Sequence, residues 1–244
     1  FNASVEIDYT VYKSTNRIIL HSNNIKIISL SLGNSNLYVE VESSCVQPNE
    51  KLLILSLSRE LMFNESGTLS IMFSGQMSEL LNGLYSSTYT TKANETKKII
   101  STHFEPDYAR DAFPCFDEPS FKAVFIVKLS YPKYYNSLSN SAAKTTVLVD
   151  DKTISVEYKP TVKMSTYLVA FVIHDFDSIS SITKSGIKVN VWLPPDMIEH
   201  GKFAAEIAPK TIDIYEKLFD IPYPIEKIDL AAIPGFEAGA MENY

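Results

Sequence analysis

The chain has 244 residues, of which 45% are hydrophobic and 21% are charged, and its formal net charge is −7. These proportions are typical of a globular protein and exclude a long disordered chain. The negative balance argues against a nucleic-acid-binding surface and suits cationic ligands such as peptide amines. No apolar run reaches the roughly 18–20 residues that a membrane helix needs, so we expect no membrane segment within the chain.

The ends and the modification motifs bear on location. The chain opens without an initiator methionine and already inside a strand-like pattern, so we expect both ends to be cut, with room for a signal or membrane anchor upstream. Asn-x-Ser/Thr sequons begin at Asn2, Asn64 and Asn94, and they permit a secreted glycoprotein. Cys45 and Cys115 do not make a disulfide framework, and the aromatic surroundings of Cys115 favour a buried free thiol.

Residues 1 to about 175 are predicted to form many short strands. Val5, Ile7, Tyr9 and Val11 alternate with other residues in the period-2 pattern of a half-buried strand. Turn residues bound most of the other candidates, which lie at residues 25–32, 36–41, 51–57, 68–73, 123–131, 145–149, 154–158 and 167–173. Such a series predicts a mainly β, antiparallel, sandwich-like domain.

The segment at residues 101–119 is too irregular for a strand or a helix. It interleaves three prolines, three phenylalanines and five acidic residues. We expect a packed loop in which Phe113 and Phe116 enter the core. Arg110 is expected to pair with Asp117 or Glu118.

The remaining quarter of the chain changes character. Residues 173–186 are rich in Ser and Asp, which indicates a linker or domain edge. A strand is expected at residues 187–193, and apolar residues from Phe203 to Leu218 then recur at helical spacing. Pro209 should start a new helix there or kink this one. A further apolar strand before Pro234 completes the start of an α+β domain, so we predict one domain at residues 1–178 and a second at residues 187–244.

The last ten residues run from Gly235 to Tyr244, and the glycines and alanines among them (Gly235, Ala238, Gly239 and Ala240) give almost no side-chain cover. Glycine and alanine expose backbone, and glycine lets another backbone approach closely. The expected guest is an extended peptide that adds itself as a strand. Glu242 then places a carboxylate where it could pair with a free α-ammonium, whose pKa is about 7.7–8.0. The alternative is a strand end of small residues with a solvated glutamate.

The run Gly239-Ala240-Met241-Glu242-Asn243 resembles the exopeptidase signature of the zinc aminopeptidases of the aminopeptidase N type. Further matching blocks follow the order of that family along most of the chain: Phe104-Glu105, Phe113 to Pro119, Tyr167 to Phe171, and Pro222 to Pro224. The resemblance implies a β-rich N-terminal domain followed by the start of a thermolysin-like catalytic domain.

The resemblance also implies one zinc ion. In the family, the metal is held by a His-Glu-x-x-His helix and a further glutamate that come after the signature, so the ligands are expected beyond Tyr244. The four histidines of this chain include no pair at helical metal-ligand spacing: His21, His103, His174 and His200. No catalytic or metal-binding residue is therefore expected among these 244 residues.

By the same resemblance, the substrate-binding residues are His103, Glu105, Gly239, Ala240, Met241, Glu242 and Asn243. Glu105 would be a second anchor for the substrate amine. Two converging carboxylates form a costly like-charge pair unless a cation lies between them, so an internal peptide segment, which brings no amine, would be rejected. The family usually has Gln where this chain has His103, and a histidine changes charge near neutral pH, which leaves the preferred first residue open.

These patterns together predict part of a zinc metalloaminopeptidase that removes N-terminal residues from peptides. The expected location is extracellular or at the cell surface, with the cytoplasm as the alternative. Two other interpretations remain open. One is a catalytically inactive relative that serves as a peptide-binding or interaction protein. The other is an unrelated extracellular β-sandwich adhesion module ending near residue 175.

Overall fold

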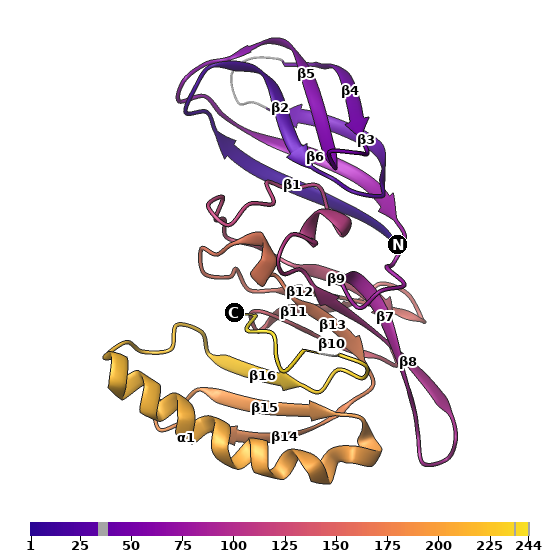
Figure 1. Cartoon of the computed structure of the whole chain (residues 1–244), viewed down its shortest axis with the longest axis vertical. Coiled ribbons are helices and arrows are strands. Elements are labelled where there is room, and N and C mark those ends of the chain that lie inside the picture. Colours follow the sequence, from indigo (N-terminus) through magenta and orange to yellow (C-terminus); the bar gives the residue numbers. More distant parts are fainter. Residues whose placement is uncertain (34–38, 237, 244) are drawn as a thin grey trace. The chain divides into compact units, whose positions relative to one another are not determined.

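The computed structural model describes residues 1–33, 39–236 and 238–243 (Figure 1). The fold is mainly β, as predicted, and most strands are antiparallel. The chain divides into two compact units. The first comprises Phe1–Leu84, His103–Phe121 and Ser165–Tyr167, and the second comprises Tyr85–Thr102, Lys122–Met164 and Leu168–Tyr244.

The first unit contains a sandwich of two three-stranded antiparallel sheets. One has the order β1-β6-β3, with β1 (Asn2–Thr10), β6 (Ser66–Gly75) and β3 (Ile25–Gly33). The other has the order β2-β5-β4, with β2 (Thr15–His21), β5 (Leu52–Leu61) and β4 (Val41–Gln47). Alternate residues of these strands meet in one core, whose most buried members include Leu20, Leu53, Leu55, Ile71 and Phe73. Because successive side chains of a strand point to opposite faces, the alternation in the sequence becomes this core.

Strand β3 departs from strict alternation at one point. Its register against β6 shifts between Ile27 and Ser29, so Ile28 and Ser29 are both exposed. Leu30 and Leu32 are again partly buried and pack against the core. A β-bulge of this kind inserts one residue and restores the inward phase after it.

The loop at residues 104–119 is packed, as predicted. Phe104 is fully buried, and Phe113 and Phe116 pack against the sandwich core. A 3₁₀ helix, η1 (Ala109–Asp111), lies between them in the sequence. Aromatic side chains therefore hold an irregular backbone that has no ladder of its own.

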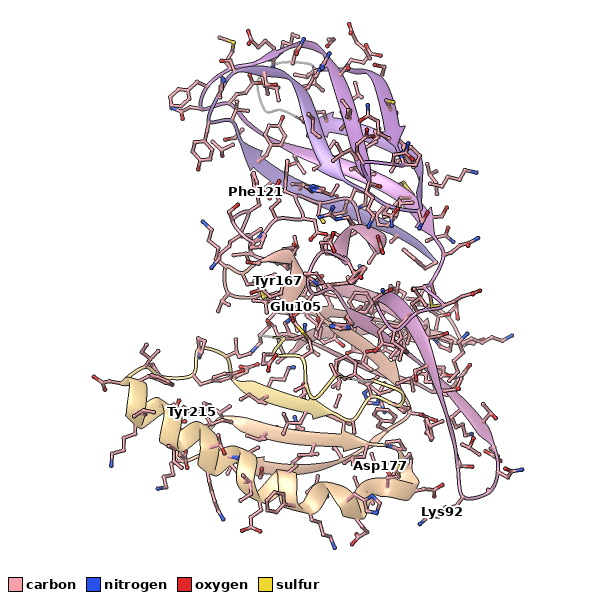
Figure 2. All side chains as sticks on the ribbon, in the orientation of Figure 1. Lys92, Glu105, Phe121, Tyr167, Asp177 and Tyr215 are labelled. Carbon is pink, nitrogen blue, oxygen red and sulfur yellow. The ribbon has the colours of Figure 1, made fainter. Side chains whose placement is uncertain are left out.

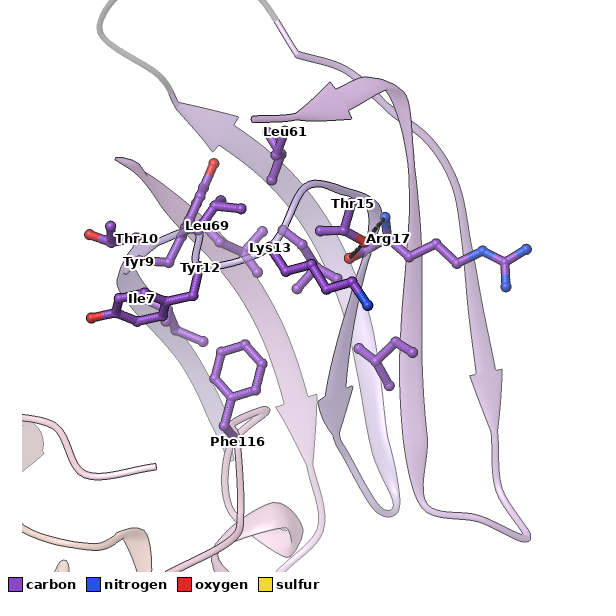
Figure 3. A pocket seen from close by; sticks show the side chains of 13 residues that line it. Ile7, Tyr9, Thr10, Tyr12, Lys13, Thr15, Arg17, Leu61, Leu69 and Phe116 are labelled. Carbon is purple, nitrogen blue, oxygen red and sulfur yellow. Dashed lines mark hydrogen bonds between the residues drawn. The ribbon is translucent and has the colours of Figure 1, made fainter. Parts of the chain in front are cut away.

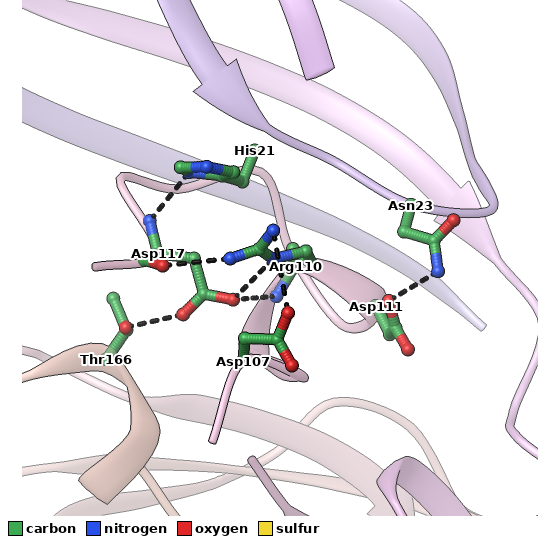
Figure 4. Close-up of polar contacts among 7 residues, drawn as sticks. All are labelled: His21, Asn23, Asp107, Arg110, Asp111, Asp117 and Thr166. Carbon is green, nitrogen blue, oxygen red and sulfur yellow. Dashed lines mark hydrogen bonds and ion pairs between the residues drawn. The ribbon is translucent and has the colours of Figure 1, made fainter. Parts of the chain in front are cut away.

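Arg110 and Asp117 cross-link this loop (Figure 4). Arg110 Nε donates to Asp117 Oδ2 at 2.9 Å, and Arg110 Nη2 donates to the Asp117 carbonyl oxygen at 2.9 Å. Thr166, in the 3₁₀ helix η2 (Thr166–Leu168), donates to Asp117 Oδ1 at 2.6 Å. The backbone N–H of Asp117 donates to Nδ1 of His21 at 3.2 Å. Asp117, with only 4% of its surface exposed, is thus paired as predicted and holds three segments of the first unit together.

The second unit contains three sheets. A four-stranded sheet has the order β10-β13-β8-β7, with β10 (Asn136–Ser139), β13 (Phe171–His174), β8 (Thr96–His103) and β7 (Gly83–Thr90). A three-stranded sheet has the order β11-β12-β9, with β11 (Ala143–Leu148), β12 (Thr153–Tyr158) and β9 (Lys128–Pro132). The first two residues of β7 and the last residue of β8 belong to the first unit.

The last sheet and the helix make the predicted α+β arrangement. The sheet has the order β14-β15-β16, with β14 (Asp177–Ile182), β15 (Lys188–Leu193) and β16 (Lys227–Ala231), and β15 pairs with β16 in parallel. Helix α1 (Lys202–Phe219) follows the 3₁₀ helix η3 (Pro195–Gly201) and runs alongside this sheet (Figure 1). Ala204 and Ala205 of α1 pack with Val191 and Leu193 of β15.

Several sequence-based boundaries were wrong. Pro209 lies inside α1, so of its two expected effects the start of a new helix is wrong, whereas a kink stays a prediction; it is one of the buried residues of the helix. Of residues 123–131 only the end, in β9, is a strand. Residues 167–173 contain part of η2 before β13 begins. The expected linker at residues 173–186 contains β14, and the strand expected at residues 36–41 falls partly on residues 34–38, outside the described part of the chain.

Two further expectations concern the state of the cysteines and the presence of a membrane-spanning helix. Cys45 is a free, exposed cysteine and Cys115 is a free, buried one, as predicted for Cys115. Burial raises the pKa of the Cys115 thiol well above its ordinary value. None of the helices in the described ranges has the length and apolar character needed to cross a bilayer.

Candidate functional site

The signature segment, residues 235–243, begins where β16 ends. Ala232 continues the pairing, because its N–H donates to the Trp192 carbonyl oxygen at 2.9 Å. Pro234 has no N–H to donate, and Gly235 has a φ of 76°, in the left-handed region that favours glycine. The chain therefore leaves the sheet at Pro234-Gly235, as the sequence indicated. Glu237 and Tyr244, which belong to the same stretch, lie outside the described residues.

Hydrogen bonds hold the segment at both ends. Ser87 in β7 donates its hydroxyl to the carbonyl oxygen of Pro234. Asn243 donates from Nδ2 to the Leu168 carbonyl oxygen at 3.3 Å. That carbonyl also accepts from Nδ2 of the buried Asn140 at 2.8 Å, and Asn140 Oδ1 accepts from the Ala170 N–H at 2.9 Å. The last residue of the signature is thus tied to a turn that is itself fixed.

Between these anchors the backbone is open. Ala238, Gly239 and Ala240 are exposed, and a Cβ added at Gly239 would meet no atom within 4 Å. Among the described residues, the backbone groups of residues 238–243 make no hydrogen bond to other backbone groups. The segment therefore offers donors and acceptors to a ligand.

The signature segment borders a cleft of about 550 Å³ within the second unit. Gly239, Ala240, Met241 and Asn243 line it together with β16 and the ends of β10 and β13. Glu242 does not line the cleft: its side chain is exposed and makes no hydrogen bond or ion pair within the described ranges. The backbone of the segment and the Glu242 carboxylate are both accessible.

A buried polar cluster lies beside the cleft and was not predicted. Asp229 of β16 accepts hydrogen bonds from Asn190 Nδ2 at 2.8 Å and from Trp192 Nε1 at 2.8 Å. It is also paired with Lys227, whose Nζ donates at 2.6 Å to the carbonyl oxygen of Ser139. The cluster fixes β16, and hence the start of the signature segment, to β15 and β10. In the sequence this cluster is indicated by a lysine and an aspartate two residues apart, on one face of an otherwise apolar strand.

His174 packs against Trp192 of the same cluster, and the two ring centroids are 5.1 Å apart. It is fully buried, and its Nδ1 accepts from the Phe176 N–H at 3.0 Å. Burial lowers the pKa of His174 to about 4, because a buried imidazolium loses its hydration. His174 is therefore a neutral structural residue near pH 7.

The other two predicted site residues belong to the first unit. Glu105, labelled in Figure 2, is exposed in the turn after Phe104. His103 ends β8, and its Nδ1 lies 3.3 Å from the Leu81 carbonyl oxygen, which assigns the proton to Nδ1 in that contact. Since Glu105 and Glu242 belong to different units, their convergence on one amine stays a prediction.

The residues present do not fit a zinc site. Within the described ranges no group of three or more His, Cys, Asp or Glu side chains is placed to hold a metal ion. Nδ1 of His21 and Nδ1 of His174 are occupied as acceptors of backbone N–H groups. We therefore derive no catalytic step through zinc from this chain.

A second, smaller cleft of about 210 Å³ lies in the first unit (Figure 3). It opens at one end of the sandwich, where Tyr12, Leu69 and Phe116 frame it and Arg17 extends away from it. None of the predicted substrate-binding residues lines it. The larger cleft beside the signature segment is therefore the candidate site.

Comparison with protein families finds two matching domain models. The family model described as Peptidase M1 N-terminal domain matches residues 1–168. This chain belongs to the M1 peptidase family. The model described as Peptidase family M1 domain matches residues 203–244, which hold all but the first residue of α1, together with β16 and the signature segment. The resemblance to zinc aminopeptidases is thereby confirmed at the level of the family.

Individual relatives of this M1 peptidase chain are aminopeptidases by name. Endoplasmic reticulum aminopeptidase 1 of Homo sapiens is 41% identical over 247 residues, and endoplasmic reticulum aminopeptidase 2 of Homo sapiens is 39% identical over 254 residues. Puromycin-sensitive aminopeptidase of Caenorhabditis elegans is 37% identical over 250 residues. Each match covers 100% of this chain and 26% of the relative, so the chain spans about a quarter of the length of these relatives.

Proposed function

We propose that this chain is the N-terminal part of a zinc aminopeptidase and supplies the surface that receives a peptide's N-terminus. The observation that carries the proposal is the open backbone of residues 238–243 beside a cleft of about 550 Å³. An extended peptide binds such a backbone by adding main-chain hydrogen bonds. The aminopeptidase names of the relatives support the same reaction class.

The carboxylates of Glu242 and Glu105 account for the proposed preference for the N-terminal end of a peptide substrate. The Glu242 carboxylate is exposed and has no ion-pair partner among the described residues, so a peptide's α-ammonium can approach it without displacing a cation of the protein. Glu105 is also exposed and is proposed as the second anchor. His103 beside it would act on the first side chain of the substrate. An ammonium between two carboxylates relieves their mutual repulsion.

Zinc enters the proposal only through the complete protein. The metal would be held by residues further along the polypeptide, and when bound it would supply an activated water and a polarised carbonyl. The part played by this chain is to bind and orient the substrate, since positioning the reacting groups is itself a large share of catalysis.

We also propose that the protein enters the secretory pathway. Two of the relatives carry the endoplasmic reticulum in their names. An extracellular or membrane-anchored location stays a prediction, and fractionation of cells that produce the complete protein would separate it from a cytoplasmic one.

The test is Glu242→Gln in the complete enzyme. This change keeps the shape and the hydrogen-bonding capacity but removes the charge. A bound substrate would cover Glu242 and make the charge pair partly buried. Losing a charged partner in such a site costs about 2–5 kcal/mol, so kcat/KM on peptides with a free N-terminus should fall on the order of 10- to 1,000-fold. N-acetylated peptides should be poor substrates already and should lose far less.

The matched control is Glu118→Gln, an equal change of charge at an exposed residue outside the proposed site, which should leave both substrate types unaffected. Equal losses on free and acetylated peptides would make Glu242 a structural residue. No turnover by the unmodified complete protein, with zinc supplied, would instead favour the inactive, peptide-binding relative.

A further inference from the structure

One sequence motif has no role in the proposed function: Asn94-Glu95-Thr96, at the turn between β7 and β8. Residues 92–96 are all exposed, and Lys92 marks this end of the hairpin in Figure 2. The turn is closed by its own backbone, since the Thr91 N–H donates to the Glu95 carbonyl oxygen and the Asn94 N–H donates to the Thr91 carbonyl oxygen, both at 2.9 Å. The hairpin end is therefore ordered and accessible.

The backbone explains why residue 94 is an asparagine. Its φ is 62°, and Asn24 and Asn64 also have positive φ values, of 54° and 65°. Asparagine tolerates this left-handed region better than most residues. Asn24 serves such a turn outside any sequon, so a turn alone does not require a hydroxyl residue two positions later.

The hydroxyl of Thr96 is what the fold leaves unexplained. It is exposed and makes no side-chain hydrogen bond within the described ranges, and the Asn94 amide likewise makes none. Ser66, the third residue of the sequon at Asn64, differs: its hydroxyl lies 2.9 Å from that of Thr10 and links β6 to β1. A structural use thus accounts for Ser66 but not for Thr96.

We propose that Asn94 is an N-glycosylation site. In this reaction a lipid-diphosphate-linked oligosaccharide is the donor. A bond forms between Asn94 Nδ2 and C1 of the first sugar, the bond from C1 to the diphosphate oxygen breaks, and the lipid diphosphate leaves with that electron pair. The amide proton passes to a base of the transferase. The proposal rests on the secretory location proposed above but not on peptidase activity.

A glycan at Asn94 has a structural consequence. The sugar must project into solvent, so the end of the β7–β8 hairpin stays uncovered in the complete protein, although the relatives are about four times as long as this chain. The nearby backbone contact, from the Lys92 N–H to Asp196 Oδ2 at 2.6 Å, then lies at an outer face of the molecule.

The experiment is peptide mapping of the complete protein, purified from the cells that produce it, before and after treatment with a peptide-N-glycosidase. That enzyme removes the glycan and converts the modified asparagine to aspartate. We expect the peptide containing residue 94 to carry aspartate after treatment and to be absent in its unmodified form before it. Recovery of mainly unmodified Asn94 from untreated protein would overturn the proposal.

Matched variants of the complete coding sequence separate the sugar from the turn. Thr96→Ser keeps the sequon and should keep the glycan, whereas Thr96→Val keeps the β-branched shape that suits a strand and should lose it. Asn94→Gly satisfies the positive φ and should also lose it. A glycan that persists in Thr96→Val would overturn the role given to the hydroxyl. Because the readout is a peptide mass, failure of the proposed enzymatic function would leave this test unaffected.

Discussion

The loop at residues 104–119 and the signature segment at residues 235–243 are both irregular, and both carry family-like motifs, yet they are built in opposite ways. The loop turns its side chains inward: Phe104 is fully buried, and Arg110 and Asp117 bond each other. In the segment, residues 238–240 have small side chains and an open backbone, and hydrogen bonds of Ser87 and Asn243 anchor the two sides. A matching motif therefore coincides with inward packing in one region and with an accessible backbone in the other.

Burial and exposure also distinguish the residues within the loop at residues 104–119. Of the residues in that loop that the sequence singled out, Asp117 is fully engaged by the fold, whereas Glu105 is exposed. Only a side chain that the fold leaves accessible can bind a ligand. Glu105 is exposed, so its side chain stays available for the substrate role proposed for it.

The largest expected effect tests the packed loop. Asp117→Ala removes the carboxylate that pairs with Arg110 and leaves that guanidinium largely buried. Breaking a buried pair from one side typically costs about 3–5 kcal/mol of unfolding free energy. Urea denaturation followed by circular dichroism, with hydrogen exchange of β2 and β5 to report on the first unit, would measure it.

The control for this prediction is Glu118→Ala at the neighbouring exposed carboxylate, which should change stability by no more than about 0.5 kcal/mol. If the two substitutions destabilise the chain equally, the loop is not held by the Asp117 network, and the contrast with the signature segment is lost.

The second prediction concerns His174, which packs against Trp192 in the cluster that fixes the start of the signature segment. The pKa of His174 is about 4 in the fold and about 6.5 in an unfolded chain. Above pH 6.5 both states are neutral and stability is fully present. Between pH 6.5 and about 4 the unfolded state takes up a proton that the folded state does not, so stability falls by on the order of 3 kcal/mol and then levels off.

Trp192 allows the pH dependence of stability to be measured, because it is the single tryptophan of the chain and packs on His174. Urea titrations read by its fluorescence at several pH values would give the profile. His174→Asn removes the titration while keeping a side-chain acceptor for the Phe176 N–H, so its stability should depend less on pH in this window. The same slope in both proteins would assign the pH dependence to other groups.

The smallest expected effect tests the openness of the signature segment. Gly239→Ala adds a Cβ with no atom within 4 Å, so thermal stability should change by less than about 0.5 kcal/mol. Gly201→Ala is the matched substitution in the same unit, where the new Cβ would lie 2.5 Å from Leu193 Cδ1. Crowding there should cost about 1 kcal/mol. A large loss at Gly239 would mean that the segment is packed and not available to a ligand.

Local pattern explains which strands could be predicted. In β1 an alternation of apolar and polar residues coincides with one more buried face, in β5 a leucine-rich run does so, and both strands were found from the sequence. Strands β7 and β8 have no such alternation, because serine, threonine and lysine occupy much of them. They are strands because neighbouring strands pair with them. The reverse error occurred at residues 123–127, where five consecutive apolar residues suggested a strand but Ala123 has only an isolated bridge, to Met164.

Helix α1 also shows which features a local pattern predicts and which depend on tertiary packing. The apolar residues that revealed its period include Phe203, Ile214 and Leu218, all exposed, whereas Ala205 and Pro209 form the buried face. Periodicity identified the helix correctly because it reports local backbone geometry. It did not identify the face that meets the sheet, since that choice depends on how closely two elements can approach.

The sequence by itself determined the family, the mainly β class, the aromatic packing of the 104–119 loop and the identity of the signature, because these depend on residue order and short-range patterning. Only the tertiary structure decided that Asp229 joins Asn190, Trp192 and Lys227 in one buried cluster, and that the backbone of residues 238–243 lies open beside a cleft. Both features depend on hydrogen-bond partners and neighbours that are distant in the sequence. A carboxylate in an apolar strand looks the same in the sequence whether it is buried or solvated, and long-range contacts alone make the difference.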